Sequence, residues 1–308
     1  MNLLFRVGLL LLAPVAICAG QTGEVDENHD DFGLLVMAHG GSEEWDNAVL
    51  AAVAPLARDY RLEVAFGMAD AASLQEAVEK LEARGAERIG VVRLFVSGDS
   101  WYERTQQIFG LLEGAPERPA AAEDHHDHLS AEDHAMEFWR VETDASFALS
   151  REGLAEAVEM GRVLADRARR LSVNPEHEDV FILAHGPEDD AENERWLASI
   201  DAHADAVRKS LPFRRVRVDS LREDWPEKRA VAERRIRELV RGSVDAGGRA
   251  IVIPFRVHGF GPYAEVLDGL DYVADRQGLL PHQSVTKWIA RQAASLENGS
   301  FGAPANVN

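Results

Sequence analysis

The same short phrase occurs twice in this chain, and it constrains the fold more than any other feature. Residues 32–40 read FGLLVMAHG, and residues 180–186 read VFILAHG. Each phrase is an uninterrupted apolar run that stops at His-Gly, which predicts a strand buried on both faces of a sheet. A repeat of this kind indicates two similar structural units.

The same succession of elements follows each phrase. Amphipathic periodicity predicts helices at 45–60, 73–84, 196–211 and 227–244. Apolar runs predict the remaining strands at 61–67, 88–96, 214–218 and 249–257. Parallel strands need long crossover connections, so this alternation predicts an α/β protein of two similar βαβαβ lobes, each with a parallel sheet flanked by helices.

The start of the chain has the features of an export signal. It carries one basic residue, Arg6, then an apolar run and small residues before Gln21, which is typical of a secretory signal peptide. We therefore expect a periplasmic or otherwise exported protein, held at a membrane only by an uncleaved signal or by a lipid on Cys18. The expected division is a signal peptide at 1–20, a first lobe at 31–112, a His- and acid-rich linker at 113–145, a connecting helix at 146–177, a second lobe at 178–295 and a tail at 296–308.

Charge and missing motifs exclude several classes of function. Lys plus Arg number 33 against 53 for Asp plus Glu, giving a formal net charge of -20, which argues against binding nucleic acid through a basic face. The sequence has no Walker or G-x-G-x-x-G loop, so we expect no nucleotide cofactor. It also has no G-x-S-x-G elbow, which removes the serine hydrolases. Chemistry with metals and protons remains.

Polar residues follow each of the four long apolar strands. Ligands of parallel sheets bind beyond the carboxyl ends of the strands, and there the sequence has His39, Asp99, His185 and His258. Imidazole is a common ligand of transition metals and a base near neutral pH, so these residues indicate a divalent-metal or proton-transfer site. A lone histidine could equally cap its strand, and Asp99 could equally shape a turn.

Three further groups are candidates for binding. One is a set of histidines in an acidic tract that could collect metal ions or simply be solvated: His125, His126, His128 and His134. Two arginines near strand ends, Arg93 and Arg256, could meet ligand carboxylates or form internal ion pairs. Aromatic residues near the same ends could form a wall for a planar ligand or pack helices on the sheets: Trp45, Trp101, Tyr102, Phe260 and Tyr263.

The phrases LLVMAHGGS at 34–42 and VVRLFVSG at 91–98 resemble the class II metal chelatases of the sirohydrochlorin cobaltochelatase and ferrochelatase type, the CbiX family. The resemblance covers residues 32–112 and 178–292, as in members with two fused halves, and the His-rich tract fits it. It implies a chelatase-like fold and a lyase of cobalamin or siroheme synthesis, with a tetrapyrrole and a divalent metal (Co²⁺ or Fe²⁺) as substrates.

The resemblance also implies roles for particular residues. His39, His185 and His258 would bind the metal and accept pyrrole protons, with Asp99 as a metal ligand at or near the matching place of the first half. Two departures are Arg93, which stands where the family usually has proline, and the signal peptide. A periplasmic protein that binds metal or tetrapyrrole without turnover is the alternative.

Overall fold

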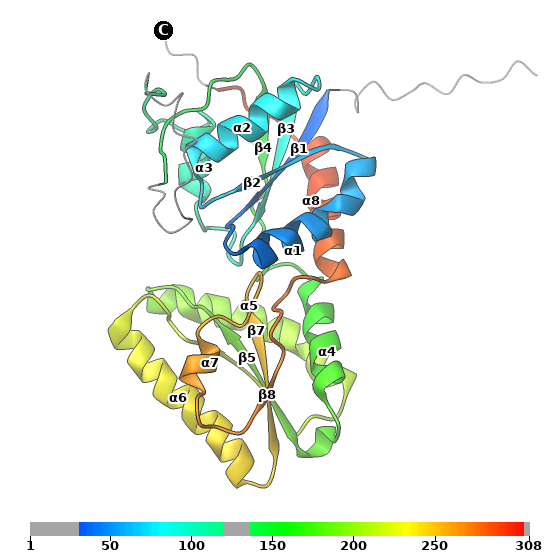
Figure 1. Ribbon diagram of the computed structural model, residues 1–308, viewed down its shortest axis with the longest axis vertical. Helices are drawn as coiled ribbons and strands as arrows, with labels where there is room; N and C mark the ends of the chain where they lie inside the picture. Colours follow the sequence, from blue (N-terminus) through cyan, green and yellow to red (C-terminus); the bar gives the residue numbers. More distant parts are fainter. Residues whose placement is uncertain (1–30, 120–135, 305–308) are drawn as a thin grey trace, which may run out of the picture.

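The structure is a computed structural model that describes residues 31–119 and 136–304 (Figure 1). The predicted signal peptide and the four clustered histidines at 125–134 lie outside the described residues. Two four-stranded sheets, ordered β2-β1-β3-β4 and β6-β5-β7-β8, form two lobes of the same topology. All their strand pairs are parallel, so the predicted fold class is confirmed.

In the first lobe, the first copy of the phrase forms the central strand β1 (Phe32–Ala38), which is buried along its whole length. The other strands are β2 (Arg61–Phe66), β3 (Arg88–Leu94) and β4 (Ser146–Leu149). The helices are α1 (Glu43–Val53), the 3-10 helix η2 (Ala54–Arg58), α2 (Ala71–Glu82) and α3 (Tyr102–Ile108). Asp70 starts α2 by accepting a hydrogen bond from the Ser73 amide at 2.9 Å, as N-cap residues do.

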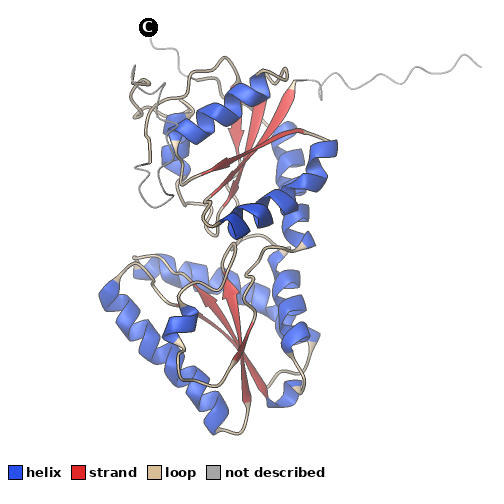
Figure 2. Ribbon diagram, in the orientation of Figure 1, coloured by secondary structure: helices blue, strands red, loops and turns tan. Residues whose placement is uncertain are grey.

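The second lobe repeats this arrangement around β5 (Glu178–Ala184). Its other strands are β6 (Arg215–Ser220), β7 (Arg249–Phe255) and the short β8 (Val273–Ala274). Its helices are α4 (Met160–Leu171), η3 (Pro175–His177), α5 (Asp190–Ser210), α6 (Pro226–Asp245) and α7 (Tyr263–Val266). Figure 2 shows helices on both sides of each sheet and the arrowheads of β5 and β7 directed toward the first lobe.

The chain crosses between the lobes twice. Residues 146–149, expected at the start of a connecting helix, instead form the edge strand β4 beside β3. Helix α4 then packs in the second lobe against α5 and β7. At the end of the second lobe the chain returns, and α8 (Gln283–Glu297) packs against α1 and β3 of the first lobe. Each lobe is therefore completed by a segment that follows the other lobe's strands.

The two crossings leave their lobes in the same way. The amides of Leu154 and Ala155 donate to the carbonyls at 95 and 96, just beyond β3, at 2.9 and 2.8 Å. The amides of Leu279 and Leu280 donate to the carbonyls at 256 and 257, just beyond β7, also at 2.9 and 2.8 Å. The duplication therefore extends beyond the strands to the connections that join the lobes.

Each sheet separates two apolar layers. In β1, Leu34 and Val36 face the layer that contains α1 and α8, whereas Leu35 and Met37 face α2 and α3, as the alternation of a strand requires. The first of these layers continues through α4 and α5 into the second lobe, while α6 and α7 cover the far face there. Within the described residues, no helix is long and apolar enough to cross a membrane.

Candidate functional site

β1 and β5 end in His-Gly turns of the same geometry. The backbone is left-handed at Gly40 (φ 74°) and Gly186 (φ 80°), a conformation that glycine adopts without steric cost. Nδ1 of His39 lies 2.7 Å from the Gly40 oxygen, and Nδ1 of His185 lies 2.8 Å from the Gly186 oxygen. Because a carbonyl oxygen only accepts, Nδ1 donates in both, and a neutral His39 ring keeps its Nε2 lone pair for a proton or a metal.

The register of the sheets identifies the counterpart of His258 in the first lobe. Ala38 pairs with Leu94, and Ala184 pairs with Phe255. Leu94 and Phe255 are therefore equivalent, and the residues that follow each by the same number of positions are Ser97 and His258. A serine thus occupies the place of His258 in the first lobe. Asp99 lies further along the turn, where its side chain is 76% exposed and lies 3.8 Å from Arg151.

The indole of Trp45 brings histidines of the two lobes to one place. It stacks on the His39 ring, with centroids 5.4 Å apart and planes inclined at 25°. On the other side of the lobe boundary it contacts the His258 ring, with centroids 6.0 Å apart and an angle of 45°. Among the described residues, Trp45 alone of the predicted aromatic wall residues lies against two of the predicted histidines. The carboxyl ends of β1 and β7 therefore meet at the boundary of the lobes.

His185 has a different set of neighbours. Its Nε2 lies 3.0 Å from an Asp224 carboxylate oxygen and 4.0 Å from one of Glu223, and the Trp225 ring meets its edge at 5.9 Å. None of these three residues was among the predicted site residues. They lie three to five residues beyond the end of β6 at Ser220, so the rule that ligands bind beyond the carboxyl ends of strands would have found them had it been applied to the edge strands as well.

Arg256 lies behind this histidine and is bonded within its own lobe. Its guanidinium donates to the Glu223 carboxylate, whose side chain is 9% exposed. Burial alone would lower the pKa of Arg256, but the charge and the hydrogen bond of Glu223, together with Tyr263, outweigh burial and raise it. Tyr263 is fully buried beside the pair, and burial followed by the Glu223 charge raises the pKa of its phenol well above the usual value.

Arg93 is likewise used inside its lobe. Its guanidinium donates to the carbonyls of Gly98 at 2.8 Å and Ser150 at 3.2 Å, and also to that of Ser100. Burial lowers the pKa of Arg93 to about 10. Neither Arg93 nor Arg256 can meet a ligand carboxylate without breaking such bonds. Arg93 instead holds the turn that follows β3, and Arg256 ties the end of β7 to Glu223 in the segment that follows β6.

The predicted metal ligands do not converge into one cluster in this conformation. Across residues 31–119 and 136–304, no group of three or more His, Cys, Asp or Glu side chains could hold a metal ion. His39 and His258 meet at Trp45, while His185 lies against its own acidic pair. Metal binding by these histidines stays a prediction, as does metal collection by the histidines outside the described residues.

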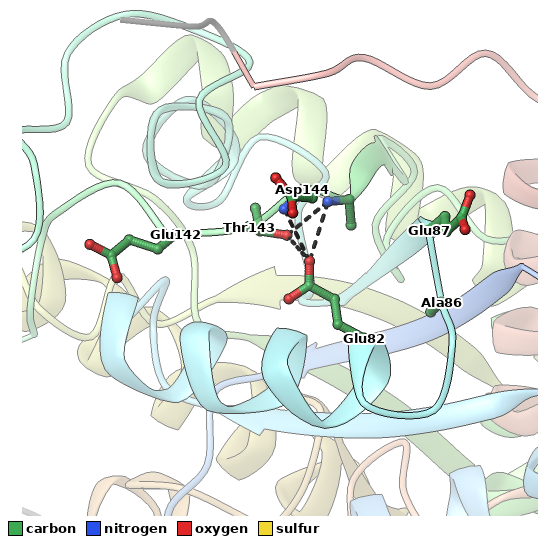
Figure 3. Close-up of a pocket in the computed structure, with 7 residues that line it drawn as sticks. Glu82, Ala86, Glu87, Glu142, Thr143 and Asp144 are labelled. Carbon is green, nitrogen blue, oxygen red and sulfur yellow. Dashed lines mark hydrogen bonds between the residues drawn. The ribbon is translucent and has the colours of Figure 1, made fainter.

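A surface pocket of about 680 Å³ lies away from these histidines (Figure 3). It is lined by Glu82, Ala86, Glu87, Glu142, Thr143, Asp144 and Ala145. Glu87 directly precedes β3 and Ala145 directly precedes β4, so the pocket lies at the amino ends of the strands. In it the Glu82 carboxylate accepts hydrogen bonds from the hydroxyl at 143 and the amides at 144 and 145, which ties this segment to α2.

Two lobes, each with a parallel four-stranded sheet flanked by helices, define an α/β protein with a chelatase-like fold. SirB from Bacillus subtilis with Fe³⁺ is similar in structure, with a TM-score of 0.57 and 14% identity over 86% of this chain and 96% of that chain. The sirohydrochlorin chelatase SirB from Bacillus subtilis subspecies spizizenii, in complex with cobalt, has a TM-score of 0.52 and 11% identity over the same shares.

A third similar structure is DR2241 from Deinococcus radiodurans, a multi-domain protein with structural similarity to chelatases. Its TM-score is 0.54 at 19% identity, over 86% of this chain and 55% of that chain, so this chain spans about half its length. No protein-family model matches this sequence, and no curated protein matches it. At these identities the structural likeness shows the fold alone.

Proposed function

We propose that this protein inserts a divalent metal, cobalt or iron, into a sirohydrochlorin-type tetrapyrrole at the boundary of its lobes. The observation that carries the proposal is the meeting of His39 and His258 at one indole, from the carboxyl ends of strands in different lobes. Neighbours of the same fold include a sirohydrochlorin chelatase in complex with cobalt and a SirB with Fe³⁺.

The chemistry fits the residues at this boundary. Insertion of M²⁺ into a tetrapyrrole releases two pyrrole protons, so the site needs groups that hold a cation loosely and then accept protons. With its Nδ1 donating to Gly40, His39 offers the Nε2 lone pair for either task. His258 offers a second imidazole from the other lobe. The net charge of -20 favours the approach of a cation.

His185 belongs to the proposed site as the matching histidine of the second half. Carboxylate oxygens of Asp224 and Glu223 lie 3.0 and 4.0 Å from its Nε2, so a proton taken up at that nitrogen can be hydrogen-bonded to Asp224. We therefore assign proton acceptance rather than metal capture to His185. The reaction needs no nucleotide. By the signal-like start of the chain, we infer that it takes place in the periplasm or another exported compartment.

Anaerobic absorbance spectra with sirohydrochlorin and Co²⁺ or Fe²⁺ test the proposal. Wild-type protein at catalytic concentration should accelerate the spectral change of metal insertion, and His39→Ala and His258→Ala should each lose about 100-fold in rate. His177→Ala is the matched control, because His177 is exposed and precedes β5 at the opposite end of the sheet. It should keep the wild-type rate.

Two results would contradict this proposal, the first for the reaction and the second for the site. Binding of metal or tetrapyrrole without any accelerated spectral change would identify the protein as a binding protein without turnover. Equal rates in wild type, His39→Ala and His258→Ala would place the site elsewhere. His185→Ala tests whether the histidine of the second half takes part in the same reaction. If His185 accepts a proton in that reaction, its removal should change the pH profile of the insertion rate.

A further inference from the structure

We propose that Trp45 is a gate: its indole fills the ligand's place at the lobe boundary and must leave before a flat ligand can contact His39 and His258 together. The inference rests on the proposed function, since it takes a planar tetrapyrrole as the ligand. It adds a displacement step that precedes metal insertion and a residue that controls its rate.

The geometry of the indole shows what it competes with. At 5.4 Å and 25° from His39, the indole covers one face of that imidazole as a stacked flat ligand would. The same indole reaches the His258 ring at 6.0 Å. Two planar groups cannot stack on the same face of His39. The indole contacts both rings, so a tetrapyrrole that contacts His39 and His258 from this same side takes the position that Trp45 holds.

The indole N–H of Trp45 lacks a hydrogen bond in this position. Within the described part of the chain, its Nε1–H is buried without a hydrogen-bond partner. An unsatisfied buried donor costs free energy, whereas aromatic stacking contributes a comparable amount of opposite sign. The position of the indole against the two histidines is therefore only weakly favoured, because rotation toward solvent exchanges the ring contacts for a hydrogen bond to water. A gate that a ligand displaces requires such a small free-energy difference between its two positions.

The backbone beside Trp45 leaves space for the ring. Trp45 lies in the first turn of α1, and Ser42 caps this helix by accepting a hydrogen bond from the Trp45 amide at 3.3 Å. A Cβ at Gly41 would lie only 3.2 Å from the indole. Glycine there lets the ring approach closely, and the ring can rotate about its own side-chain bonds while the capped helix stays in place.

The second lobe provides a matched indole. Trp225 precedes α6 and meets the His185 ring at 5.9 Å, edge to face at 88°. Among the described residues, Nε1 of Trp225 is not one of the buried donors that lack a hydrogen-bond partner. Trp225 therefore shares the His-indole contact of Trp45 but neither the stacked geometry nor the unsatisfied donor.

Binding kinetics of metal-free sirohydrochlorin to the wild type, two variants of Trp45 and one control variant test the gate. Trp45→Ala removes the gate and should bind about tenfold faster than wild type. Trp45→Phe keeps an aromatic ring but removes the N–H that lacks a hydrogen bond. The phenyl ring should therefore stay against the two histidines more firmly, and the variant should bind sirohydrochlorin more slowly than wild type. Trp139→Phe, whose indole packs in the layer of α2 and α3 on the far face of the first sheet, should not differ from wild type. Slower or weaker binding by Trp45→Ala, with Trp45→Phe near wild type, would show a fixed stacking wall and overturn the gate.

A measurement without ligand separates this inference from the proposed function. In ¹⁵N-labelled protein, the indole N–H signal lost in Trp45→Phe belongs to Trp45, and its exchange with water reports the opening of the gate. Trp288 is the internal reference, because its buried indole donates to Glu152 at 3.2 Å. Exchange at Trp45 should be much faster than at Trp288, and equal exchange would overturn the gate. If sirohydrochlorin fails to bind, the proposed function fails, and the exchange comparison still decides the gate.

Discussion

The guanidinium of Arg291 and the carboxylate of Glu152 form a two-point ion pair, with Nη2 2.6 Å from Oε1 and Nη1 3.0 Å from Oε2. Glu152 lies on the first crossing between the lobes, and Arg291 lies on α8, which follows the second. Arg291 also bonds Glu159 just before α4, with 2.8 Å between Nε and Oε1. This network ties the two crossings together at the point where the lobes join.

Arg291→Met should destabilise the protein by about 1 kcal/mol at pH 7, a small value because the arginine is 43% exposed and water screens the pairs. The bonds to Arg291 lower the pKa of Glu152 and Glu159 below their usual 4.5. Lowered carboxyl pKa values contribute stability above pH 4.5 that is lost as pH falls through the folded-state values. Urea unfolding at pH 7 and near pH 3 should therefore show a smaller difference between variant and wild type in acid. A constant difference would contradict this account.

Gly186→Ala should destabilise the protein by about 2 kcal/mol. The residue has a φ of 80°, and a Cβ there would lie 2.8 Å from the Cβ of Ser220. Gly242→Ala in α6 is the control, because nothing lies within 4 Å of its added Cβ and alanine favours a helix interior. It should be neutral or stabilising in thermal unfolding. Equal effects of the two changes would contradict the strained His-Gly turn.

Glu223→Ala should cost about 3 kcal/mol of unfolding free energy, because it leaves the Arg256 guanidinium without its carboxylate in a largely buried site. The double change Glu223→Leu with Arg256→Met should recover much of the loss, since an apolar pair of similar volume needs no charge partner. Denaturant unfolding measures both. If the double variant is less stable than Glu223→Ala, the pair is not the cause of the loss.

Thermal stability should fall as pH drops from 7.5 to 5, partly because of His203 on α5. Its Nε2 lies 2.8 Å from the Ala155 carbonyl on the first crossing, and its ring lies parallel to that of Phe255. Burial lowers the pKa of His203 below its usual 6.5, despite the opposing effect of the Ala155 hydrogen bond and Glu159. Below pH 6.5 the unfolded chain therefore binds more protons, and stability is lost as pH falls.

His203→Gln, which can still donate to Ala155, tests this assignment. Its melting temperature should change less than that of wild type over the same pH range, as followed by circular dichroism. His282, whose pKa burial also lowers, accounts for part of what remains. An unchanged pH dependence in His203→Gln would exclude His203 as a contributor.

Much of the fold could be predicted from local pattern. Buried strands of a parallel sheet are apolar on both faces, so the runs that end at His39 and His185 identify the two central strands. Their repetition predicts two lobes, and strand polarity places the histidines at the carboxyl ends. Residues adjacent in the chain are enough for these inferences, because the hydrophobic pattern of a segment indicates whether its strand is buried, and the order of residues gives its carboxyl end.

The crossings between the lobes could not be predicted in the same way. Strand β4 has only four residues, Ser146–Leu149, too few for a distinct pattern. The amphipathic period of α8 predicts that one face is buried, but not that Trp288 packs in the first lobe rather than the second. Which lobe receives a helix depends on complementary surfaces and on ion pairs such as that of Arg291 with Glu152.

The sequence by itself determined two α/β lobes, the strand ends and the candidate histidines that follow them, because each depends on local periodicity and on residues adjacent in the chain. Only the tertiary structure decided that Trp45 contacts both His39 and His258, while His185 lies against Asp224. The contact of Trp45 with His258 crosses between the lobes, so it depends on how they are docked by packing and charge across the two crossings. The contact of His185 with Asp224 forms within the second lobe and depends on the pairing of β5 with β6. Neither contact is encoded in a local pattern.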